Sequence, residues 1–541
     1  MKRNKMLYLL LAMTLVLTLL AGCGGNKADN PSAQNAGETT FTVALGSDIV
    51  SLDPALAYDF TTNQVVNQIT EGLLTFDSHN QLVPLLAKEW KAVDDTTYVY
   101  TIRDDVCFSD GSPMTMDDVL FSLERTKNPD TGAYVQWMYG AVDSITQTGD
   151  WELTVKLKHP SATWQYVFGT TAGHIISKAY YEAHKDKFGT AEGGIMGTGA
   201  FTFESWKSGQ EIVLARNKNY WDKGTQVALS KLIFKIIPED TTRVTALQTG
   251  QVDFTAEPPL DMIDTLKADN KLNVEGVDTL GLTFLAFNTQ RAPFNDVNVR
   301  KAIYHALDMK SIHDNIVKSA GLQGTVLPNG PALYTIEPER WKEYLSKAPV
   351  YEYNLEKAKA YMAKSSVPNG FSCKLLTTES SIRYSESLAI QEALKALNIN
   401  VELVKLSSDE HTKYQFGGVM DANGKRDYDM ILAGWEADYP DISGNIEPLY
   451  ASASVGADGT NAAAYVNKKV DELIAAQAVS SKPGERNDLI FQALDIITDD
   501  VPYIFLEYPI KQTVLNKKFT GFTMNASWLW NLYFKNIQLT A

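Results

Sequence analysis

The residues best suited to chemistry lie in the stretch from Asp427 to Asp441, which reads DYDMILAGWEADYPD. Residues 428–434 are nearly continuous in apolar side chains and are bounded by acidic and proline-containing segments, so they are predicted to form a short buried strand. Asp438 follows this strand, between Trp435 and Tyr439. Ligands of open α/β sheets bind outside the carboxyl ends of the strands, and a carboxylate flanked by aromatic rings suits a cationic or amino-bearing ligand. Taken alone, the stretch also fits the commoner structural role of such a residue, a turn or a helix cap.

The rest of the chain shows no recognisable catalytic or metal-binding pattern. The seven histidines are scattered, and none has the HExxH spacing or a nearby cysteine partner. No G-x-S-x-G elbow or Walker loop is present. The glycines within residues 193–199 fit neither the Rossmann nor the P-loop spacing and are interpreted as a crossing between domains, and residues 421–425 are predicted to form a hairpin turn. The sequence therefore predicts a binding protein that is not an enzyme and has neither a metal site nor a cofactor.

The start of the chain is typical of an exported and anchored protein. Residues 1–22 join a basic start to a short apolar run and small residues, as a secretory signal peptide does. The segment Leu19–Cys23 resembles a bacterial lipobox, which implies cleavage before Cys23 and diacylation of its thiol. Residues 23–40 are then the lipidated cysteine and a flexible tether, and two acyl chains are enough for stable anchoring. We expect an extracytoplasmic protein held on the cell membrane by this lipid; the alternative is a soluble secreted protein.

Composition argues against a nucleic-acid partner. Loss of residues 1–22 removes three basic and no acidic side chains, so the formal charge moves from −16 to −19. Such a chain lacks the basic footprint that nucleic acids require. A chain of 541 residues exceeds the size of a single core, so two or three lobes are expected. With Cys23 acylated, Cys107 and Cys373 are left either as two small buried thiols or as a pair.

Local patterns alternate between strand and helix. Residues 63–73 carry apolar side chains at helical spacing, and Thr115 is expected to cap another helix. Residues 372–378, 385–397 and 399–406 are predicted to form a strand, a helix and a strand, the unit that builds a parallel or mixed sheet. The fold class is therefore predicted to be α/β, with two lobes and a cleft between them.

A series of sequence blocks, all in one order, carries a family resemblance. The blocks are Ser51–Pro54, Glu71–Leu74, Leu86–Trp90, Ile102–Val119, Gly197–Phe201, Trp206, Gly209, Arg216–Trp221, Ala246–Asp253, Phe287–Arg300 and Gly434–Asp441. Together they resemble the signature of the large extracytoplasmic solute-binding proteins of peptide ABC importers, the oligopeptide- and dipeptide-binding family.

This resemblance implies a periplasmic-binding-protein-like fold of type II, in the large three-domain cluster, whose two lobes enclose a hinged ligand cleft. The implied domains are domain I at residues 41–80, 197–283 and 502–541, an inserted domain II at residues 81–196, and domain III, the second lobe, at residues 284–501.

The resemblance also implies a function. In the family, the aspartate of the Trp-x-x-Asp block accepts the charged α-amino group of a bound peptide, and Trp435 and Asp438 match that block. The implied ligand-binding residues are Asp438, Trp435, Gly434, Ala433, Tyr439, Tyr58, Asp59, Phe60, Tyr134 and Glu257. The chain is thus expected to be a lipid-anchored monomer that captures oligopeptides and delivers them to the permease subunits of an ABC importer.

Two alternatives stay open. Relatives with this scaffold bind nickel complexes, haem or saccharides, so the same fold with a non-peptide ligand is one of them. The other is a secreted hydrolase, for which no nucleophile and base set is recognisable. One departure from the family bears on the ligand: Leu432 stands where some oligopeptide-binding members have an arginine three residues before the tryptophan, so a carboxylate-holding arginine is not carried over to this chain.

Overall fold

Strands and helices alternate along the chain in the computed structural model, which describes residues 39–325, 327–328, 337–348 and 352–540. Cys23, with the predicted signal peptide and most of the tether, lies outside the described residues. The strands are β1 Thr40–Leu45, β2 Glu71–Gly72, β3 Leu74–Phe76, β4 Leu82–Pro84, β5 Ala87–Asp94, β6 Thr97–Ile102, β7 Val142–Gly149, β8 Glu152–Leu157, β9 His174–Ile175, β10 Phe201–Lys207, β11 Glu211–Arg216, β12 Lys231–Ile236, β13 Phe254–Thr255, β14 Leu272–Asp278, β15 Gly281–Phe287, β16 Gly321–Gln323, β17 Phe371–Thr378, β18 Ile399–Leu406, β19 Met430–Glu436, β20 Tyr503–Asn516, β21 Phe519–Thr520 and β22 Gln538–Leu539.

The helices complete this inventory. They are α2 Phe60–Ile69, α3 Met116–Lys127, α4 Trp164–Val167, α5 Lys178–His184, α6 Asp240–Gln248, α7 Ile263–Ala268, α8 Val297–Ala306, α9 Met309–Ile312, α10 Pro338–Lys347, α11 Leu355–Lys364, α12 Ser381–Leu394, α13 Ser408–Gln415, α14 Ser443–Tyr450, α15 Lys468–Ala478, α16 Pro483–Asp500 and α17 Trp528–Asn531. Among the described residues, no helix has both the length and the apolar character needed to span a membrane.

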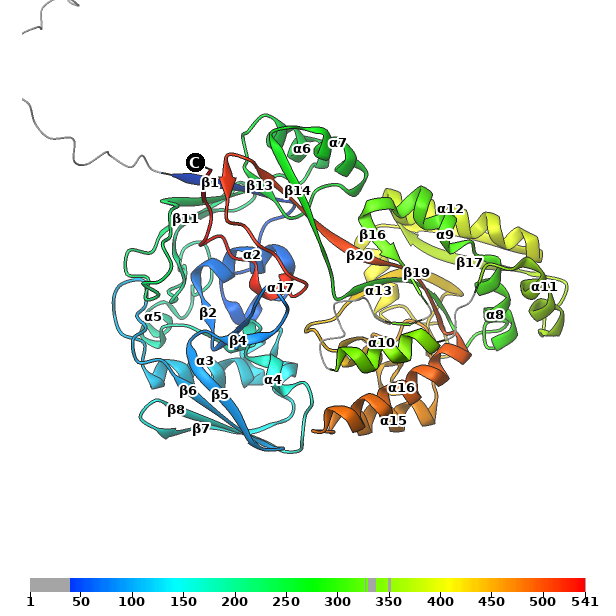
Figure 1. Cartoon of the computed structure of the whole chain (residues 1–541), viewed down its shortest axis with the longest axis horizontal. Helices are drawn as coiled ribbons and strands as arrows, with labels where there is room; N and C mark the ends of the chain where they lie inside the picture. The colour runs from blue at the N-terminus through cyan, green and yellow to red at the C-terminus, as the bar shows by residue number, and fades with distance from the viewer. Residues whose placement is uncertain (1–38, 326, 329–336, 349–351, 541) are drawn as a thin grey trace, which may run out of the picture. The chain divides into compact units, whose positions relative to one another are not determined.

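A mixed sheet of twelve strands connects two lobes (Figure 1). We call residues 40–278 and 510–540 the first lobe and residues 281–509 the second lobe. The strand order is β10-β11-β12-β1-β13-β20-β15-β19-β17-β18, and β14 and β16 also pair with β20. The first lobe carries, in addition, a four-stranded antiparallel sheet of order β5-β6-β8-β7. The architecture is thus α/β with two lobes, as predicted from the alternating patterns.

Strand β20 forms the crossing between the lobes. Its first half pairs with β15 and its second half with β14, both antiparallel. Because β14 and β15 follow each other in the chain, both segments pass from lobe to lobe at the same place. There the Thr279 hydroxyl donates a hydrogen bond to the Pro509 carbonyl over 3.0 Å. Two neighbouring segments that cross together form a hinge about which a cleft can close.

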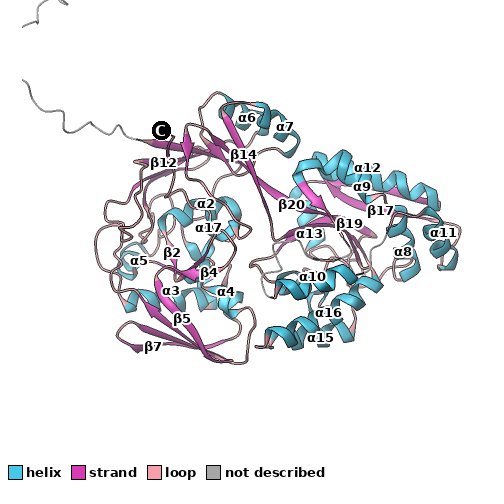
Figure 2. Ribbon diagram, viewed as in Figure 1, coloured by secondary structure: helices cyan, strands magenta, loops and turns pink. Residues whose placement is uncertain are grey.

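The sheet of the second lobe is covered on both faces by helices (Figure 2). Side chains alternate along β15, so Phe284 and Ala286 pack into one core while Leu285 and Phe287 pack into the other. Helices α10, α14, α15 and α16 contribute to the first of these cores, and α8, α9, α11 and α12 to the second. A strand buried on both faces has few polar side chains, which explains the apolar runs seen in the sequence.

Several of the sequence blocks meet in the first lobe around one buried acid. The Glu71 carboxylate, which is 2% exposed, accepts hydrogen bonds from the Tyr220 hydroxyl at 2.8 Å, the Trp221 indole at 2.7 Å and the Thr198 hydroxyl at 2.9 Å. These residues come from three separate blocks. Their joint occurrence is therefore explained by packing, because a buried carboxylate is costly unless it is hydrogen-bonded.

Close packing also explains the glycines of residues 193–199. A Cβ atom at Gly197 would lie 2.2 Å from the Ile69 carbonyl oxygen, and one at Gly199 would lie 2.5 Å from the Gln68 carbonyl oxygen. Glycine is required at both positions, since the end of α2 leaves no room for a side chain.

Most predicted local elements are confirmed, with shifted bounds. Residues 399–406 match β18, and Thr115 forms a capping box at the start of α3. The helix predicted at residues 63–73 is α2, which ends at Ile69 because Thr70 turns extended and β2 pairs with β9. The strand predicted at residues 428–434 is β19, which lies two residues later because its register with β15 begins at Met430. Residues 385–397 were predicted too late, since α12 spans Ser381–Leu394.

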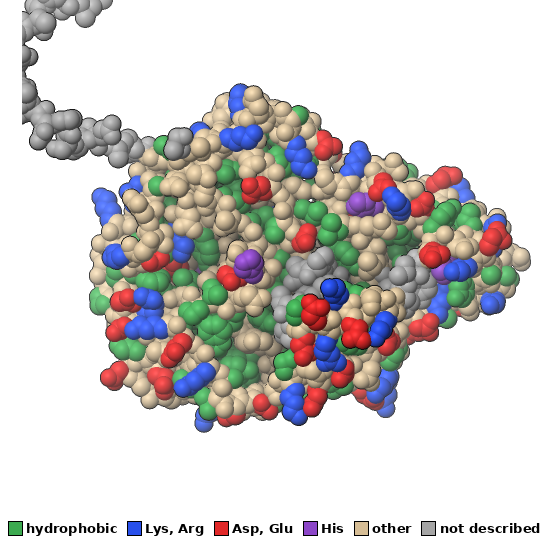
Figure 3. All heavy atoms as spheres, viewed as in Figure 1, with side chains coloured by type: hydrophobic (Ala, Val, Ile, Leu, Met, Phe, Trp, Pro, Cys, Tyr) green, Lys and Arg blue, Asp and Glu red, His purple; other side chains and the backbone are tan. Residues whose placement is uncertain are grey.

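The predicted hairpin turn is confirmed, and the two remaining cysteines are unpaired. The turn at residues 421–425 is a hairpin closed by the Asp421 N–H, which donates to the Lys425 carbonyl over 2.7 Å. Cys107 and Cys373 are free thiols and do not form a disulfide. On the face seen in Figure 3, acidic and basic side chains are interspersed.

Candidate ligand-binding site

Asp438 lies where the second lobe meets the first. It stands two residues beyond the end of β19, in the loop that leads to α14. Its Oδ1 accepts a hydrogen bond from the Tyr58 hydroxyl at 3.0 Å, and its backbone carbonyl accepts one from the Trp530 indole N–H. Tyr58 and Trp530 belong to the first lobe, so the carboxylate lies at the boundary between the lobes.

The Asp438 carboxyl is poorly solvated. It is partly buried, and burial raises its pKa to about 7 despite the opposing hydrogen bond from Tyr58. Burial and the charge of Asp438 also raise the pKa of Tyr58, so its hydroxyl keeps its proton and remains a donor. A desolvated carboxylate with a neutral donor gains most from a nearby cation. The site is therefore suited to hold an ammonium group.

Lys511 is a further cation in this region, on β20. Its Nζ lies 4.0 Å from the centre of the Phe60 ring and 4.3 Å from that of Trp528. Burial lowers the pKa of Lys511, and the charges of Glu257 and Glu436 oppose this shift. Phe60 and Glu257, both expected at the site, thus lie around a lysine that the sequence analysis missed. The sequence contained one indication of this residue, since Lys511 lies within a long and mostly apolar run.

Glu436 contributes a second desolvated carboxyl group, at the end of β19. Its Oε1 accepts the Leu280 N–H at 3.0 Å, and burial raises its pKa to about 8. Burial therefore favours the neutral form of Glu436, as it does that of Asp438.

A buried ion pair fixes the loop that carries Asp438. The Asp441 carboxylate accepts two hydrogen bonds from the Arg486 guanidinium, at 2.8 and 2.6 Å, and its side chain is 1% exposed. Tyr439, one residue after Asp438, stacks on Tyr166 of the first lobe with ring centres 5.5 Å apart. The loop is thus held from both lobes.

The neighbouring β19 residues have different roles. The Ala433 side chain lies in the hydrophobic core of the second lobe. Gly434 is exposed, and its carbonyl accepts a hydrogen bond from the Gln415 side chain at 2.6 Å. The Trp435 indole donates to the Gly444 carbonyl at 2.7 Å, which ties the strand to α14. Of these three, only Gly434 presents its surface to solvent to a large extent.

The remaining expected residues, Asp59 and Tyr134, are not in contact with Asp438. Asp59 caps α2, because its Oδ1 accepts the Thr62 N–H at 2.9 Å. Tyr134 is 53% exposed, and its backbone N–H donates to the Ala55 carbonyl. The structure thus brings Tyr58 and Tyr439 directly to Asp438 and gives Asp59 a structural role.

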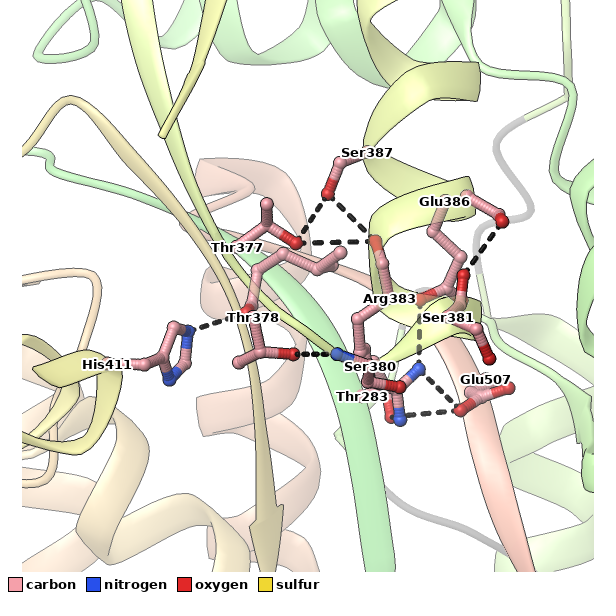
Figure 4. A network of polar contacts seen from close by, with 12 residues as sticks. Thr283, Thr377, Thr378, Ser380, Ser381, Arg383, Glu386, Ser387, His411 and Glu507 are labelled. Carbon is pink, nitrogen blue, oxygen red and sulfur yellow. Dashed lines mark hydrogen bonds and ion pairs between the residues drawn. The ribbon is translucent and has the colours of Figure 1, made fainter. Parts of the chain in front are cut away.

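Arg383 is a further cation of the second lobe that the sequence did not indicate, and it lies within a network of polar contacts (Figure 4). It lies in the first turn of α12, just past the carboxyl end of β17. Its Nη1 is 2.9 Å from Glu386 Oε2 and 2.7 Å from Glu507 Oε1, and its Nη2 donates to the Thr283 hydroxyl at 2.6 Å. Thr283 lies on β15 and pairs with Gly434 of β19. Arg383 therefore contacts the strand next to the one that leads to Asp438.

The contacts of Arg383 use its two Nη atoms and leave Nε available. Its side chain is 21% exposed, and no hydrogen bond from its Nε occurs among the described residues. Leu432, the position where some family members carry an arginine, is fully buried in the core. Arg383 thus lies on α12, whereas the β19 position contributes a core side chain.

Affinity for a ligand with a free amino group is expected to pass through a maximum near neutral pH. Asp438 ionises only as pH rises towards its pKa of about 7, and a peptide α-amino group loses its charge above about pH 8. Titration calorimetry with one tripeptide between about pH 5 and pH 9 checks this, with its N-acetylated form as the control. An equally flat profile for both forms would contradict a charge-based role for Asp438.

Two lobes with a desolvated carboxylate at their boundary are the arrangement expected of a solute-binding protein. The family model described as bacterial extracellular solute-binding proteins, family 5 Middle, matches residues 81–457. The chain belongs to this family, whose members serve ABC importers.

Individual relatives cover nearly the whole chain. The probable D,D-dipeptide-binding periplasmic protein DdpA of Escherichia coli K12 is 29% identical and covers 90% of this chain and 91% of its own length. The oligopeptide-binding protein OppA of Bacillus subtilis 168 is 26% identical over 99% of both chains. The periplasmic binding protein DppA from Helicobacter pylori, solved with the peptide STSA, has a TM-score of 0.75 and 26% identity over 93% of this chain and 98% of its own. Other relatives are named for glutathione and heme, so ligands vary within the family.

Proposed function

We propose that this protein captures oligopeptides outside the cytoplasm by their free amino ends and delivers them to the permease subunits of an ABC importer. The observation that carries the proposal is the Asp438 carboxylate, which is desolvated at the lobe boundary and accepts a hydrogen bond from Tyr58. An ammonium group there would form charge-assisted hydrogen bonds with the carboxylate. Lobe closure about β20 would then enclose the peptide. The names of DdpA, OppA and DppA support a peptide ligand.

The proposal includes attachment to the membrane. The lipobox-like segment Leu19–Cys23 and the tether composition after it support diacylation of Cys23 and an extracytoplasmic location. The protein is proposed to act as a monomer. The described residues also support the proposed domain division, since the chain passes between the lobes from β14 to β15 and again within β20, near the proposed boundaries.

Mass spectrometry of the protein purified without added ligand tests both parts. Denaturation is expected to release peptides with free amino ends, and the intact mass is expected to show an acylated Cys23. Release of haem, a nickel complex or a saccharide would favour the alternative, the same fold with a non-peptide ligand. An intact mass that retains residues 1–22, or a cleaved chain without acyl groups, would refute the anchor.

Arg383 is proposed to hold the carboxylate end of the ligand. Arg383→Lys keeps the positive charge between Glu386 and Glu507 but loses the planar fork that binds a carboxylate in two places. We expect affinity to fall about tenfold for peptides with a free carboxyl end and to stay unchanged for their C-terminal amides. Titration calorimetry with both peptide forms measures this, and Arg340→Lys, on the surface of α10, is the control. Equal losses for acid and amide would refute the carboxylate contact.

A further inference from the structure

A cavity of about 210 Å³ lies at the seam between the lobes, beside Tyr439. Its first-lobe wall includes Trp137 and Trp164, and its second-lobe wall includes Tyr439 and Glu447. At its edge the Ala162 N–H of the first lobe donates to the Ala478 carbonyl of the second over 2.8 Å. The cavity therefore takes its present form only when the lobes are in contact.

Glu447 is the acid of this cavity, and it has no counter-charge. It lies on α14, and its carboxylate makes no hydrogen bond or ion pair with any residue in the described part of the chain. The side chain is accessible to solvent, yet the surrounding protein desolvates it enough to raise its pKa. An exposed carboxylate with no ion-pair partner among the described residues can pair with a cation of the ligand.

The basic side chains near the cavity do not pair with Glu447. The Lys158 ammonium donates to the Gly140 carbonyl on the wall, at 3.2 Å, and His159 Nδ1 lies 3.0 Å from the Pro160 carbonyl. Neither residue is within ion-pair distance of Glu447 in the described structure. Trp137 is 49% exposed although it is a large aromatic side chain, and an indole face is the preferred aromatic surface for a cation.

The cavity adjoins the Asp438 site. Tyr439 lines the cavity and follows Asp438 directly in the chain. Burial raises the pKa of Tyr439 most, and the charges of Asp438 and, more weakly, Glu447 add to the shift. Asp438 and Glu447 are thus both close enough to Tyr439 to influence its pKa. The cavity therefore lies beside the loop that carries Asp438.

We propose that this cavity is a side-chain subsite for a lysine- or arginine-like group near the amino end of the ligand, with Glu447 as its counter-charge and Trp137 as its aromatic wall. The inference rests on the proposed function, because it assumes a peptide held at Asp438. Each water-sized group fills roughly 30 Å³, so the five heavy atoms of a lysine side chain fit within the cavity volume. The charge-assisted hydrogen bond and the aromatic contact both select a cation over a neutral side chain.

The test compares four tripeptides by titration calorimetry: Ala-Ala-Ala, Lys-Ala-Ala, Ala-Lys-Ala, and norleucine-Ala-Ala, whose first side chain has the four carbons of lysine but lacks its amino group. For the unmodified protein we expect at least one lysine peptide to bind about tenfold more tightly than the neutral peptides. In Glu447→Gln, which keeps the side-chain shape, this ratio is expected to fall to about one, while the affinity for Ala-Ala-Ala stays unchanged.

Glu356→Gln is the matched control, because it makes the same change of glutamate to glutamine at a side chain that is 88% exposed on α11. It is expected to leave the lysine preference intact, and thermal unfolding checks that all variants are folded. Equal binding of all four peptides by the unmodified protein would overturn the subsite while leaving the proposed function in place. A lysine preference that survives Glu447→Gln would overturn the role of Glu447. Failure of every peptide to bind would overturn the proposed function itself.

Discussion

Asp438→Asn is expected to reduce affinity for free-amine peptides about 10- to 100-fold, because a charge-assisted hydrogen bond to the ligand ammonium is lost. The substitution keeps the shape of the side chain, so the Tyr58 hydroxyl still finds an oxygen acceptor. N-acetylated peptides carry no charge at that end, and their affinity is expected to be the same for both proteins. Titration calorimetry of each peptide in both forms gives the comparison.

The same substitution is expected to stabilise the ligand-free protein. The pKa of Asp438 is raised from 3.8 to about 7 in the folded state, so between these values the folded state binds a proton that the unfolded state has released. Stability of the ligand-free protein therefore falls as pH rises through this window and stays lower above it. The Asp438→Asn variant does not lose stability in this way, because its amide does not ionise. It should unfold at a higher temperature than the unmodified protein at about pH 8, with little difference at about pH 4.

Two outcomes would contradict this account of Asp438. Equal loss of affinity for free-amine and N-acetylated peptides would show that the substitution disturbs the cleft in general. A lower unfolding temperature for the variant at high pH would show that the carboxylate is satisfied within the protein, and the site would then be structural.

Asp441→Ala is expected to destabilise the protein by about 3–5 kcal/mol, because it leaves the Arg486 guanidinium buried without its partner. The Arg486 side chain is 6% exposed, so water cannot replace the lost carboxylate. The loop that carries Asp438 would also lose its main support, and peptide affinity should fall with stability. Chemical denaturation of the ligand-free protein measures the change in the free energy of unfolding.

An exposed ion pair supplies the control. Lys88 and Asp104 are 44% and 54% exposed, and Asp104→Ala is expected to leave the free energy of unfolding almost unchanged, because solvent screens an exposed pair. The double variant Asp441→Leu, Arg486→Met should be more stable than Asp441→Ala alone, since no unpaired charge remains. If Asp441→Ala cost no more than Asp104→Ala, the ion pair would not be what holds the loop.

Local sequence determined much of the secondary structure. The strand at residues 399–406 and the capping box at Thr115 depend on side chains a few positions apart, and such short-range patterns can be recognised in one chain. The apolar run before Asp438 likewise indicated a buried strand, and the family blocks indicated the two-lobed fold. Where bounds shifted, a contact distant in sequence was the cause, as in the pairing of β2 with β9 that limits α2.

The composition of the site was decided by tertiary structure. The Tyr58 hydroxyl reaches Asp438 across 380 positions of sequence, and Lys511 meets Phe60 only because β20 returns through the first lobe. Arg383 lies at the start of a helix in which no sequence pattern indicated a binding residue. Sequence by itself determined that a carboxylate follows a buried strand. Only the packing of two lobes decided that this carboxylate is desolvated, since burial depends on what distant segments place around it.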